Sequence, residues 1–398
     1  MLFVITLISF IIYAFFVLIF IKNIKVHHKV DCKHSELVSI VCSARNEENN
    51  IKNLLDALLK QDYDLKLMQV IVVDDCSTDQ TIKILSEYKS LFPDFEYFTA
   101  KNREQSISPK KNALSQAMQR VKHNIVLTTD ADCIPSKTWV NGMVDAFIKQ
   151  PEADMVVGFS ETDTTEKIIA FNKKKKSIFV NIPNHLLFEY FDFLTLMFAT
   201  AASLNANLYF SCSGQNLSFK KTSFDKVGGY EPIKNYISGD DLHLMQLFNK
   251  NNMHISFANN DSARVKTRSI SSFGSLFNQR ARWASNMKFM LFSNTIFFIY
   301  LLSVFFVLTL IPILLFLEPK ILIGLVLLKM IIDGVFVYKS SIAFKLWDRY
   351  TNNGWQAKLN FHYLFFLWLV FQPIYTIIIS FMGFFSLFKW KDRKGLKI

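Results

Sequence analysis

The stretch Asn124-Ile-Val-Leu-Thr-Thr-Asp-Ala-Asp132 decides how this chain folds and where its chemistry lies. It begins as a buried β-strand, because apolar and β-branched residues follow one another, and it ends in two carboxylates. Asp130 and Asp132 face the same side of an extended segment, and their mutual repulsion calls for a cation or a raised pKa. Oxygen ligands suit Mg²⁺ or Mn²⁺, above all where the ion also holds a diphosphate. The sequence therefore predicts a Mg²⁺ or Mn²⁺ site on Asp130 and Asp132.

On both sides of this stretch, short β-branched runs alternate with amphipathic ones. The strand starts recur about every 30 residues, which is the length of a βαβ unit. We therefore predict an α/β domain with a mostly parallel sheet, helices on both faces, and ligands at the carboxyl ends of the strands. The expected strands are 37–42, 69–73, 96–99, 124–129 and 154–159, and the expected helices are 50–60, 80–91, 111–121 and 138–149.

Both ends of the chain are strongly apolar. The 398 residues are 51% hydrophobic and include 40 Phe. Residues 1–21 carry no charge and no cleavage site of a signal peptide, and they can cross a bilayer core of about 30 Å, so we expect a retained anchor. Further spans are expected at 292–317, 321–338 and 361–388, with a cytosolic connector at 339–358.

The basic residues flank these apolar segments. The net charge of +12 comes mostly from the lysines after the first apolar segment, from 173–176 and from the tail at 389–398. Such clusters usually bind anionic lipid head groups, and because no nucleic-acid motif accompanies them we expect no nucleic-acid partner. The positive-inside rule places the central domain in the cytosol, as for a bacterial inner-membrane protein. A single last span would leave the basic tail outside, so either 361–388 re-enters around Gln372-Pro373 or the number of spans differs by one.

The apolar segment 185–210 is long enough to cross a membrane, but it contains Glu189 and Asp192. A carboxylate at the bilayer centre costs about 2.5–3.5 kcal/mol. A crossing here would also separate Asp132 from Asp241. We therefore expect an interfacial or core helix.

Polar clusters follow the first two expected strands. After 69–73, Asp74 and Asp75 can accept hydrogen bonds from a nucleobase or a ribose, although helix capping explains the run about as well. The cluster 43–48 after the first strand is either a capping cluster or the far wall of the base pocket. In the functional interpretation the donor-binding residues of these two clusters are Ala44, Asn46, Glu47, Asp74 and Asp75.

Two further stretches have a functional and a plain interpretation. Lys111 opens a helix and can balance the charge of a donor phosphate, or it belongs to a solvated lysine pair. Asp240 and Asp241 precede an apolar helix stripe. Asp240 is either an ordinary charge at a helix N-terminus or a neighbour that tunes Asp241, which would act as general base toward an acceptor hydroxyl. Gly214 and Asn216 either line the acceptor pocket or form a plain turn and strand.

The stretch Gln279-Arg280-Ala281-Arg282-Trp283 lies just before the expected C-terminal spans. Interfacial Trp and snorkelling Arg are common at such borders. The functional alternative has Arg282 binding the diphosphate and Trp283 stacking on the acceptor.

In this order and spacing, the motifs resemble the membrane-bound branch of the family 2 glycosyltransferases, from about residue 37 to Trp283. Asp74-Asp75 corresponds to the family's nucleotide-binding position, Asp130-Ala131-Asp132 to its D-x-D, Asp240-Asp241 to its acidic pair and Gln279 to Trp283 to its Q-x-x-R-W. The resemblance implies a GT-A fold and inverting, metal-dependent transfer from a nucleotide-diphosphate sugar, with Asp241 as base. It also places Arg282 and Asp130 with the donor, and Asp240, Gln279 and Trp283 with the acceptor.

Three functions remain in view. Because three or four spans are few for a secretion channel, we favour transfer of one sugar, or a few, to a lipid-borne acceptor. The alternatives are a processive polysaccharide synthase of the cellulose, chitin or hyaluronan type, and a non-catalytic membrane scaffold. The expected organisation is an anchor at 1–21, a cytosolic GT-A domain at 36–288, membrane helices at 292–388 and a basic tail at 389–398.

Overall fold

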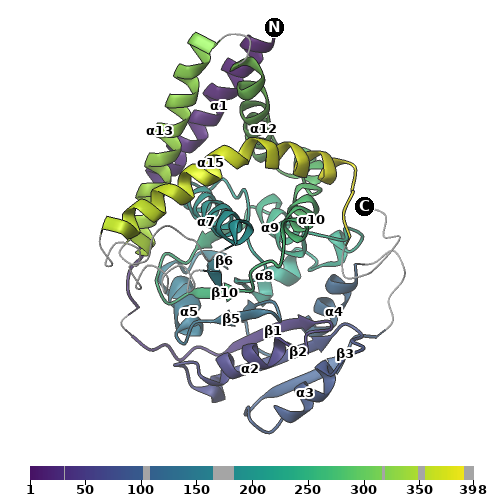
Figure 1. Cartoon of the computed structure of the whole chain (residues 1–398). Coiled ribbons are helices and arrows are strands. Elements are labelled where there is room, and N and C mark those ends of the chain that lie inside the picture. Colours follow the sequence, from purple (N-terminus) through teal and green to yellow (C-terminus); the bar gives the residue numbers. More distant parts are fainter. Residues whose placement is uncertain (31, 102–107, 165–182, 316–318, 348–354, 390–398) are drawn as a thin grey trace. The chain divides into compact units, whose positions relative to one another are not determined.

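The computed structural model describes residues 1–30, 32–101, 108–164, 183–315, 319–347 and 355–389 (Figure 1). They form two compact units, and each is described by itself. The α/β unit contains His27–Glu161 and Ser211–Arg268. The helical unit contains Met1–Val26, Thr162–Phe210 and Ser269–Lys394, so parts of the expected 36–288 domain belong to it. The lysines at 173–176 and the tail after Lys389 lie outside the described residues.

A seven-stranded sheet is the centre of the α/β unit. Its strands are β1 (Val38–Ala44), β2 (Met68–Asp74), β3 (Phe95–Thr99), β4 (Ile125–Thr128), β6 (Ala153–Val157), β8 (Leu217–Lys220) and β9 (His254–Phe257). The order is β3-β2-β1-β4-β8-β6-β9. The pairs β1/β2, β1/β4, β2/β3 and β6/β9 are parallel, whereas β8 is antiparallel to β4 and β6. The predicted mostly parallel sheet is confirmed.

A second sheet has three short strands, β5 (Cys133–Pro135), β7 (Phe159–Thr162) and β10 (Arg264–Thr267), in the order β5-β10-β7. The expected strand at 154–159 is thus divided, with β6 in the large sheet and β7 in the small one. β5 starts immediately after the two aspartates that follow β4. The second sheet therefore holds the far end of the acidic turn in place.

Helices fill the connections of the α/β unit. They are α2 (Ile51–Leu59), α3 (Thr81–Glu87), α4 (Pro109–Met118), α5 (Trp139–Lys149), α8 (Lys221–Lys226) and α9 (Asp240–Lys250), with single turns η1 (Leu65–Leu67) and η2 (Glu231–Ile233). In α2 the fully buried residues are Ile51, Leu54, Leu55 and Leu58. This spacing of three and four residues puts all of them on one face of the helix, which explains why the sequence predicts it.

The register of the sheet brings several loops to one edge. Ala44 lies beside Asp74, and Asp74 lies beside Thr99, so β1, β2 and β3 end level with one another. Because β8 is antiparallel, its first residue, Leu217, lies opposite Thr128, the last residue of β4. The loop before β8 therefore meets the loop after β4.

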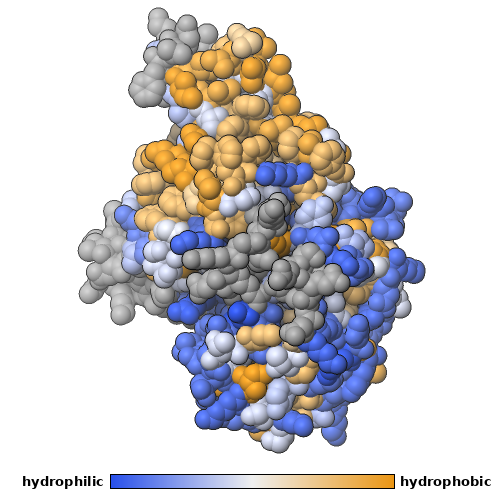
Figure 2. Space-filling view, turned by 90° about the vertical axis from the view of Figure 1, so that its right-hand side faces the viewer, coloured by the Kyte–Doolittle hydropathy of each residue, from blue (hydrophilic) through white to orange (hydrophobic). Residues whose placement is uncertain are grey.

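The helical unit consists of long apolar helices and two shorter ones. They are α1 (Leu2–Asn23), α7 (Asn184–Asn205), α10 (Phe273–Ala284), α11 (Met287–Ser293), α12 (Thr295–Leu315), α13 (Pro319–Ala343) and α15 (Trp355–Phe384). Among the described residues, α1, α7, α12 and α15 are long and apolar enough to span a membrane. The expected span at 321–338 forms α13, which carries Lys329 and Asp333 and is not one of these four. Figure 2 shows apolar residues gathered over the long helices and hydrophilic residues over the α/β unit.

Two details of this unit bear on the predictions. In α7, Glu189 accepts a hydrogen bond from the Ile270 amide (3.2 Å) and Asp192 accepts one from Arg280 Nε (3.0 Å), so both carboxylates are paired inside the protein. Of the two alternatives for the last apolar segment, re-entry around Gln372-Pro373 does not fit, because α15 continues through Pro373 as one helix. In Figure 1, α1, α12 and α13 run together and α15 runs across them.

Candidate active site

Lys110 joins two acidic groups that are far apart in the sequence. Its Nζ lies 2.9 Å from Asp130 Oδ1 and 2.9 Å from Asp240 Oδ2. Asp130 follows β4, Asp240 begins α9, and Lys110 lies in the first turn of α4. Three elements therefore meet at the carboxyl edge of the sheet. The sequence places both acidic pairs in one site, and within the α/β unit the geometry brings them together.

The turn after β4 presents the two predicted metal ligands. The turn is fixed at both ends, because the Cys133 amide donates to the Asp130 carbonyl (3.1 Å) and Thr129 Oγ1 donates to the Gln215 carbonyl (2.9 Å). Asp132 Oδ1 accepts a weak bond from Cys133 Sγ (3.7 Å). The donor set is made of carboxylate oxygens, which fits a hard divalent cation, although Lys110 holds one oxygen of Asp130.

Asp241 is held by two backbone amides. Gly214 N donates to Oδ2 (2.7 Å) and Leu242 N donates to Oδ1 (2.7 Å). A Cβ on residue 214 would lie 3.3 Å from Asp241 Oδ2, so the glycine permits this close approach. The predicted acceptor residue Gly214 and the predicted base Asp241 are thus direct neighbours.

The neighbouring aspartates differ in their affinity for a proton. Burial raises the pKa of Asp241, and the negative charge of Asp240 raises it further. Burial acts on Asp240 in the same direction, but the charge and hydrogen bond of Lys110 outweigh it and hold the pKa of Asp240 below its usual value. The pair therefore combines a carboxylate that binds a proton less readily than usual with one that binds it more readily.

The ammonium group of Lys111 hydrogen-bonds to backbone carbonyls. Its side chain is 1% exposed, and its Nζ donates to the carbonyls of Tyr236 and of Ser238, the latter at 3.1 Å. Burial lowers the pKa of Lys111 to about 8. The prediction of a phosphate contact at Lys111 is therefore corrected: Lys110 is the lysine that reaches the acidic groups, and sequence reasoning missed it although the adjacent pair was visible.

The loops after β1 and β2 hydrogen-bond to each other. Asn46 N donates to Ser77 Oγ (2.9 Å), and Thr78 N donates to Asn46 Oδ1 (2.9 Å). The Asp75 amide donates to the Ala44 carbonyl (2.8 Å). These contacts bring Ala44, Asn46 and Asp75 together, and donor binding by these three residues stays a prediction.

Two other residues of these loops support the turns. Asp74 is 1% exposed, and its carboxylate accepts the Ser77 amide at 3.2 Å. Glu47 Oε2 accepts from Asn50 Nδ2 (2.8 Å) at the start of α2. Capping is therefore part of what this cluster does, and donor binding by Asp74 and Glu47 stays a prediction.

Asn216 is a structural residue. It is fully buried, its Nδ2 donates to the carbonyls of Phe159 and Ala263 (both 3.0 Å), and its Oδ1 accepts from Trp139 Nε1 (2.9 Å). The whole amide is engaged inside the protein. The predicted contact of Asn216 with an acceptor is thus corrected, because its side chain ties β8 to α5 and to the second sheet.

Gln279, Arg282 and Trp283 lie on α10, in the helical unit. Their neighbour Arg280 fixes this part of the helix. It donates to Asp192 (3.0 Å) and to Gln279 Oε1 (3.0 Å), and its guanidinium lies 4.1 Å from the Trp283 ring centroid. The roles of Gln279, Arg282 and Trp283 toward substrates stay predictions.

Comparison with known proteins agrees with this geometry. Residues 39–215 match the model of the glycosyl transferase family 2. The chain carries a family 2 glycosyltransferase domain. The match includes nearly all of β1, Asp74 and Asp75 at the end of β2, the acidic turn and most of the loop before β8, and it ends before Asp240. The assignment of Asp241 therefore depends on the site geometry.

Relatives are similar over part of their length. A probable glycosyltransferase, YdaM, from Bacillus subtilis is 24% identical over 49% of this chain and 43% of its own. The poly(ribitol-phosphate) β-N-acetylglucosaminyltransferase TarS from Staphylococcus aureus is 32% identical over 30% of this chain and 20% of its own. The chain thus spans less than half of either relative. In fold it is similar to the mannosyltransferase PcManGT from Pyrobaculum calidifontis, with a TM-score of 0.57 and 15% identity over 97% of both chains.

Proposed function

We propose that this protein is an inverting glycosyltransferase that moves a sugar from a nucleotide-diphosphate donor to a hydroxyl of a lipid-borne acceptor. The observation that carries the proposal is the Lys110 bridge between Asp130 and Asp240, which puts the predicted base beside the predicted donor carboxylates. Asp241 follows Asp240 directly and is oriented by two amides. In this proposal, the acceptor and the donor diphosphate bind to groups of one site.

In the proposed reaction, the acceptor oxygen forms a bond to the anomeric carbon while the bond from that carbon to the diphosphate breaks. The acceptor proton passes to Asp241, whose raised pKa makes it a stronger base than an ordinary aspartate. The nucleoside diphosphate leaves with both bonding electrons. Attack and departure on opposite faces invert the anomeric centre.

Asp130 and Asp132 would hold a divalent cation, Mg²⁺ or Mn²⁺, and such an ion offsets the charge that develops on the leaving diphosphate. Lys110 would hold Asp130 and Asp240 close to each other through its two ion pairs. The mannosyltransferase of similar fold is recorded with GDP-mannose and Mn²⁺. For this chain the donor class and the metal are part of the proposal.

The lipid-borne acceptor is proposed from the apolar helices. Within the described part of the chain, four helices could span a membrane. The polar residues in the middle of α13 are satisfied by each other, with Lys329 Nζ 2.6 Å from Asp333 Oδ2, and Tyr13 donates to Asp333 (2.5 Å). A closed polar cluster of this kind fits helix packing better than a pore that conducts a polymer. We further propose that the α/β unit lies in the cytosol of a bacterial cell, at the inner membrane.

A second candidate is a processive synthase. It is favoured by a poly-β-1,6-N-acetyl-D-glucosamine synthase from Staphylococcus epidermidis that is 27% identical over 33% of this chain. Membranes that contain the protein would be incubated with labelled donor, and the product would be sized. A short glycolipid supports the first proposal, and a long polymer supports the second.

The catalytic proposal is tested with Asp241→Asn, which keeps the shape of the side chain and removes its basicity. We expect at least a 100-fold loss of transfer with unchanged donor affinity. The control is Asp225→Asn, because Asp225 is exposed and pairs only locally with Lys221. Transfer at the wild-type rate in Asp241→Asn, or in excess EDTA, would exclude the mechanism. Absence of transfer in the unmodified protein with any donor would favour the scaffold.

A further inference from the structure

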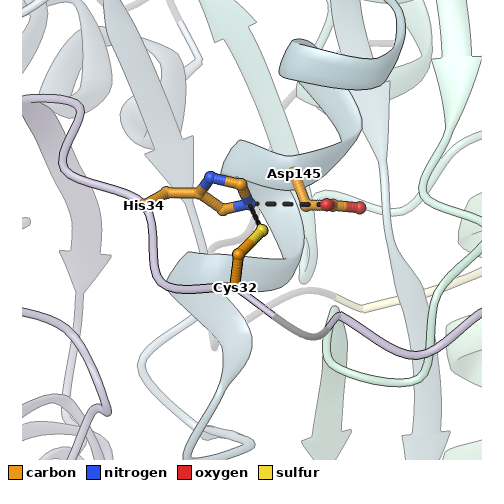
Figure 3. A group of neighbouring side chains, drawn as sticks. All are labelled: Cys32, His34 and Asp145. Atoms are coloured by element: carbon orange, nitrogen blue, oxygen red, sulfur yellow. Dashed lines mark hydrogen bonds and ion pairs between the residues drawn. The ribbon is translucent and has the colours of Figure 1, made fainter.

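A second group of metal-ligating side chains lies in the α/β unit, away from the acidic turn. Residues 24–37 connect α1 to β1 and carry His28, Cys32 and His34. This connector lies against α5, which supplies Asp145 (Figure 3). Potential ligand atoms of Cys32, His34 and Asp145 all lie within 4.8 Å of one another. Neither the proposed transfer reaction nor the family match gives these residues a role.

The connector is held in place by its backbone. The His28 amide donates to the Asn259 carbonyl (3.0 Å), and the Asp261 amide donates to the His28 carbonyl (3.2 Å). The His34 amide donates to Asn141 Oδ1 (3.0 Å), one turn before Asp145 on α5. The three side chains therefore converge on a fixed framework.

The two oxygens of Asp145 have different neighbours. Oδ2 is held by His28 Nε2 at 2.8 Å and by Lys149 Nζ at 3.2 Å. Oδ1 has His34 Nε2 as its neighbour, at 3.4 Å. The side chain of Asp145 is 2% exposed, so Oδ1 is a fixed and buried acceptor directed at His34. This arrangement resembles a metal-binding carboxylate whose other oxygen is oriented by hydrogen bonds.

The distances favour a shared ion over direct hydrogen bonds. The contacts from His34 Nε2 are 3.4 Å to Asp145 Oδ1 and 3.7 Å to Cys32 Sγ. Good N–H···O hydrogen bonds lie at about 2.7–3.2 Å, so the first contact is long. In a tetrahedral Zn²⁺ site with the usual bond lengths, two ligand atoms lie about 3.3 Å apart for N and O and about 3.6 Å apart for N and S. The two observed separations match these two edges, and the third pair, Cys32 Sγ and the Asp145 carboxylate, lies within 4.8 Å.

We propose that Cys32, His34 and Asp145 form a Zn²⁺ site that fastens the connector to α5. Thiolate and imidazole select a borderline-soft ion such as Zn²⁺ over Mg²⁺ or Mn²⁺, which the oxygen-only turn at Asp130 and Asp132 would take. Three protein ligands leave the fourth position for water. Cys32 is exposed, which gives the ion a path of entry. The connector is then held by metal ligation as well as by hydrogen bonds.

The test uses the full chain in detergent, stripped of metal and kept in excess Mg²⁺ so that oxygen sites are filled. It is titrated with Co²⁺, whose thiolate complexes have a charge-transfer band in the near ultraviolet, and then with Zn²⁺. We expect one Co²⁺ per chain with a thiolate band, and displacement of that Co²⁺ by one Zn²⁺. Cys32→Ser should abolish the band, and Cys76→Ser, the matched change at another exposed cysteine, should preserve it.

A second variant tests the proposed orientation of Asp145. His28→Ala removes a hydrogen bond to the ligand carboxylate and should weaken Zn²⁺ binding by about 10- to 100-fold without removing the thiolate band. The proposal is overturned if the unmodified protein has no thiolate band, or if Cys32→Ser retains it. Loss of transfer activity plays no part in the readout, so failure here and failure of the proposed transfer function can be told apart.

Discussion

Replacement of Lys110 by Met tests whether the acidic turn and the start of α9 form one site. The variant removes two charge-assisted hydrogen bonds, to Asp130 and to Asp240. Such a bond contributes about 1.5–3 kcal/mol to stability. The side chains of Lys110, Asp130 and Asp240 are 23, 30 and 17% exposed. Because water weakens such bonds, we take the lower end of this energy range for each of them. The expected loss is about 3 kcal/mol in the free energy of unfolding.

Thermal melting of the detergent-solubilised protein measures this loss. For a unit of this size, 3 kcal/mol lowers the melting temperature by roughly 6–12 °C. Lys122→Met is the matched control, since Lys122 pairs with Asp94 at the surface and such pairs contribute less than about 1 kcal/mol. A double-mutant cycle with Asp240→Asn isolates one bond, with an expected coupling of about 1.5 kcal/mol. A coupling below about 0.5 kcal/mol would refute the bridge.

The other predictions concern the base, the structural amide and α10. Asp240→Asn removes the charge that raises the pKa of Asp241, so the acid limb of the pH profile of kcat/KM should move to lower pH; a shift to higher pH would contradict the assigned roles. Asn216→Ala removes three hydrogen bonds inside the protein and should lower the free energy of unfolding by about 1.5–4.5 kcal/mol, measured by melting. Arg280→Met breaks a buried ion pair with Asp192 and should cost about 3–5 kcal/mol, whereas Arg282→Met should lose donor turnover with a smaller loss of stability. Equal melting temperatures of the two arginine variants would argue against a structural role for Arg280 and a substrate role for Arg282.

Periodicity predicts the long elements well and the short ones poorly. The expected helices at 50–60 and 138–149 differ from α2 and α5 by one residue at most ends, because their apolar spacing continues for several turns. The strands β5, β9 and β10 have three or four residues each, too few for an alternating pattern to stand out. Their position depends on pairing with distant segments.

The site residues show a different limit of sequence reasoning. Lys110 and Lys111 are adjacent, but consecutive residues of a helix point about 100° apart. One therefore reaches the acidic edge and the other reaches buried carbonyls, and only the orientation of α4 on the sheet decides which. For Asn216 the sequence leaves open an acceptor contact or a plain turn and strand, and only the structure shows that its amide is buried and engaged. The acidic positions were predictable because the carboxyl ends of neighbouring strands share one edge.

The crosswise course of α15 has a consequence for counting membrane crossings (Figure 1). If α15 lies along the head-group layer, the chain does not change sides of the membrane within it. If α12 and α13 then cross in opposite directions, the end of α15 at Phe384 lies on the side from which α12 departed, although α15 is itself long and apolar enough to span. The conflict between an odd number of C-terminal spans and the charge rule then does not arise.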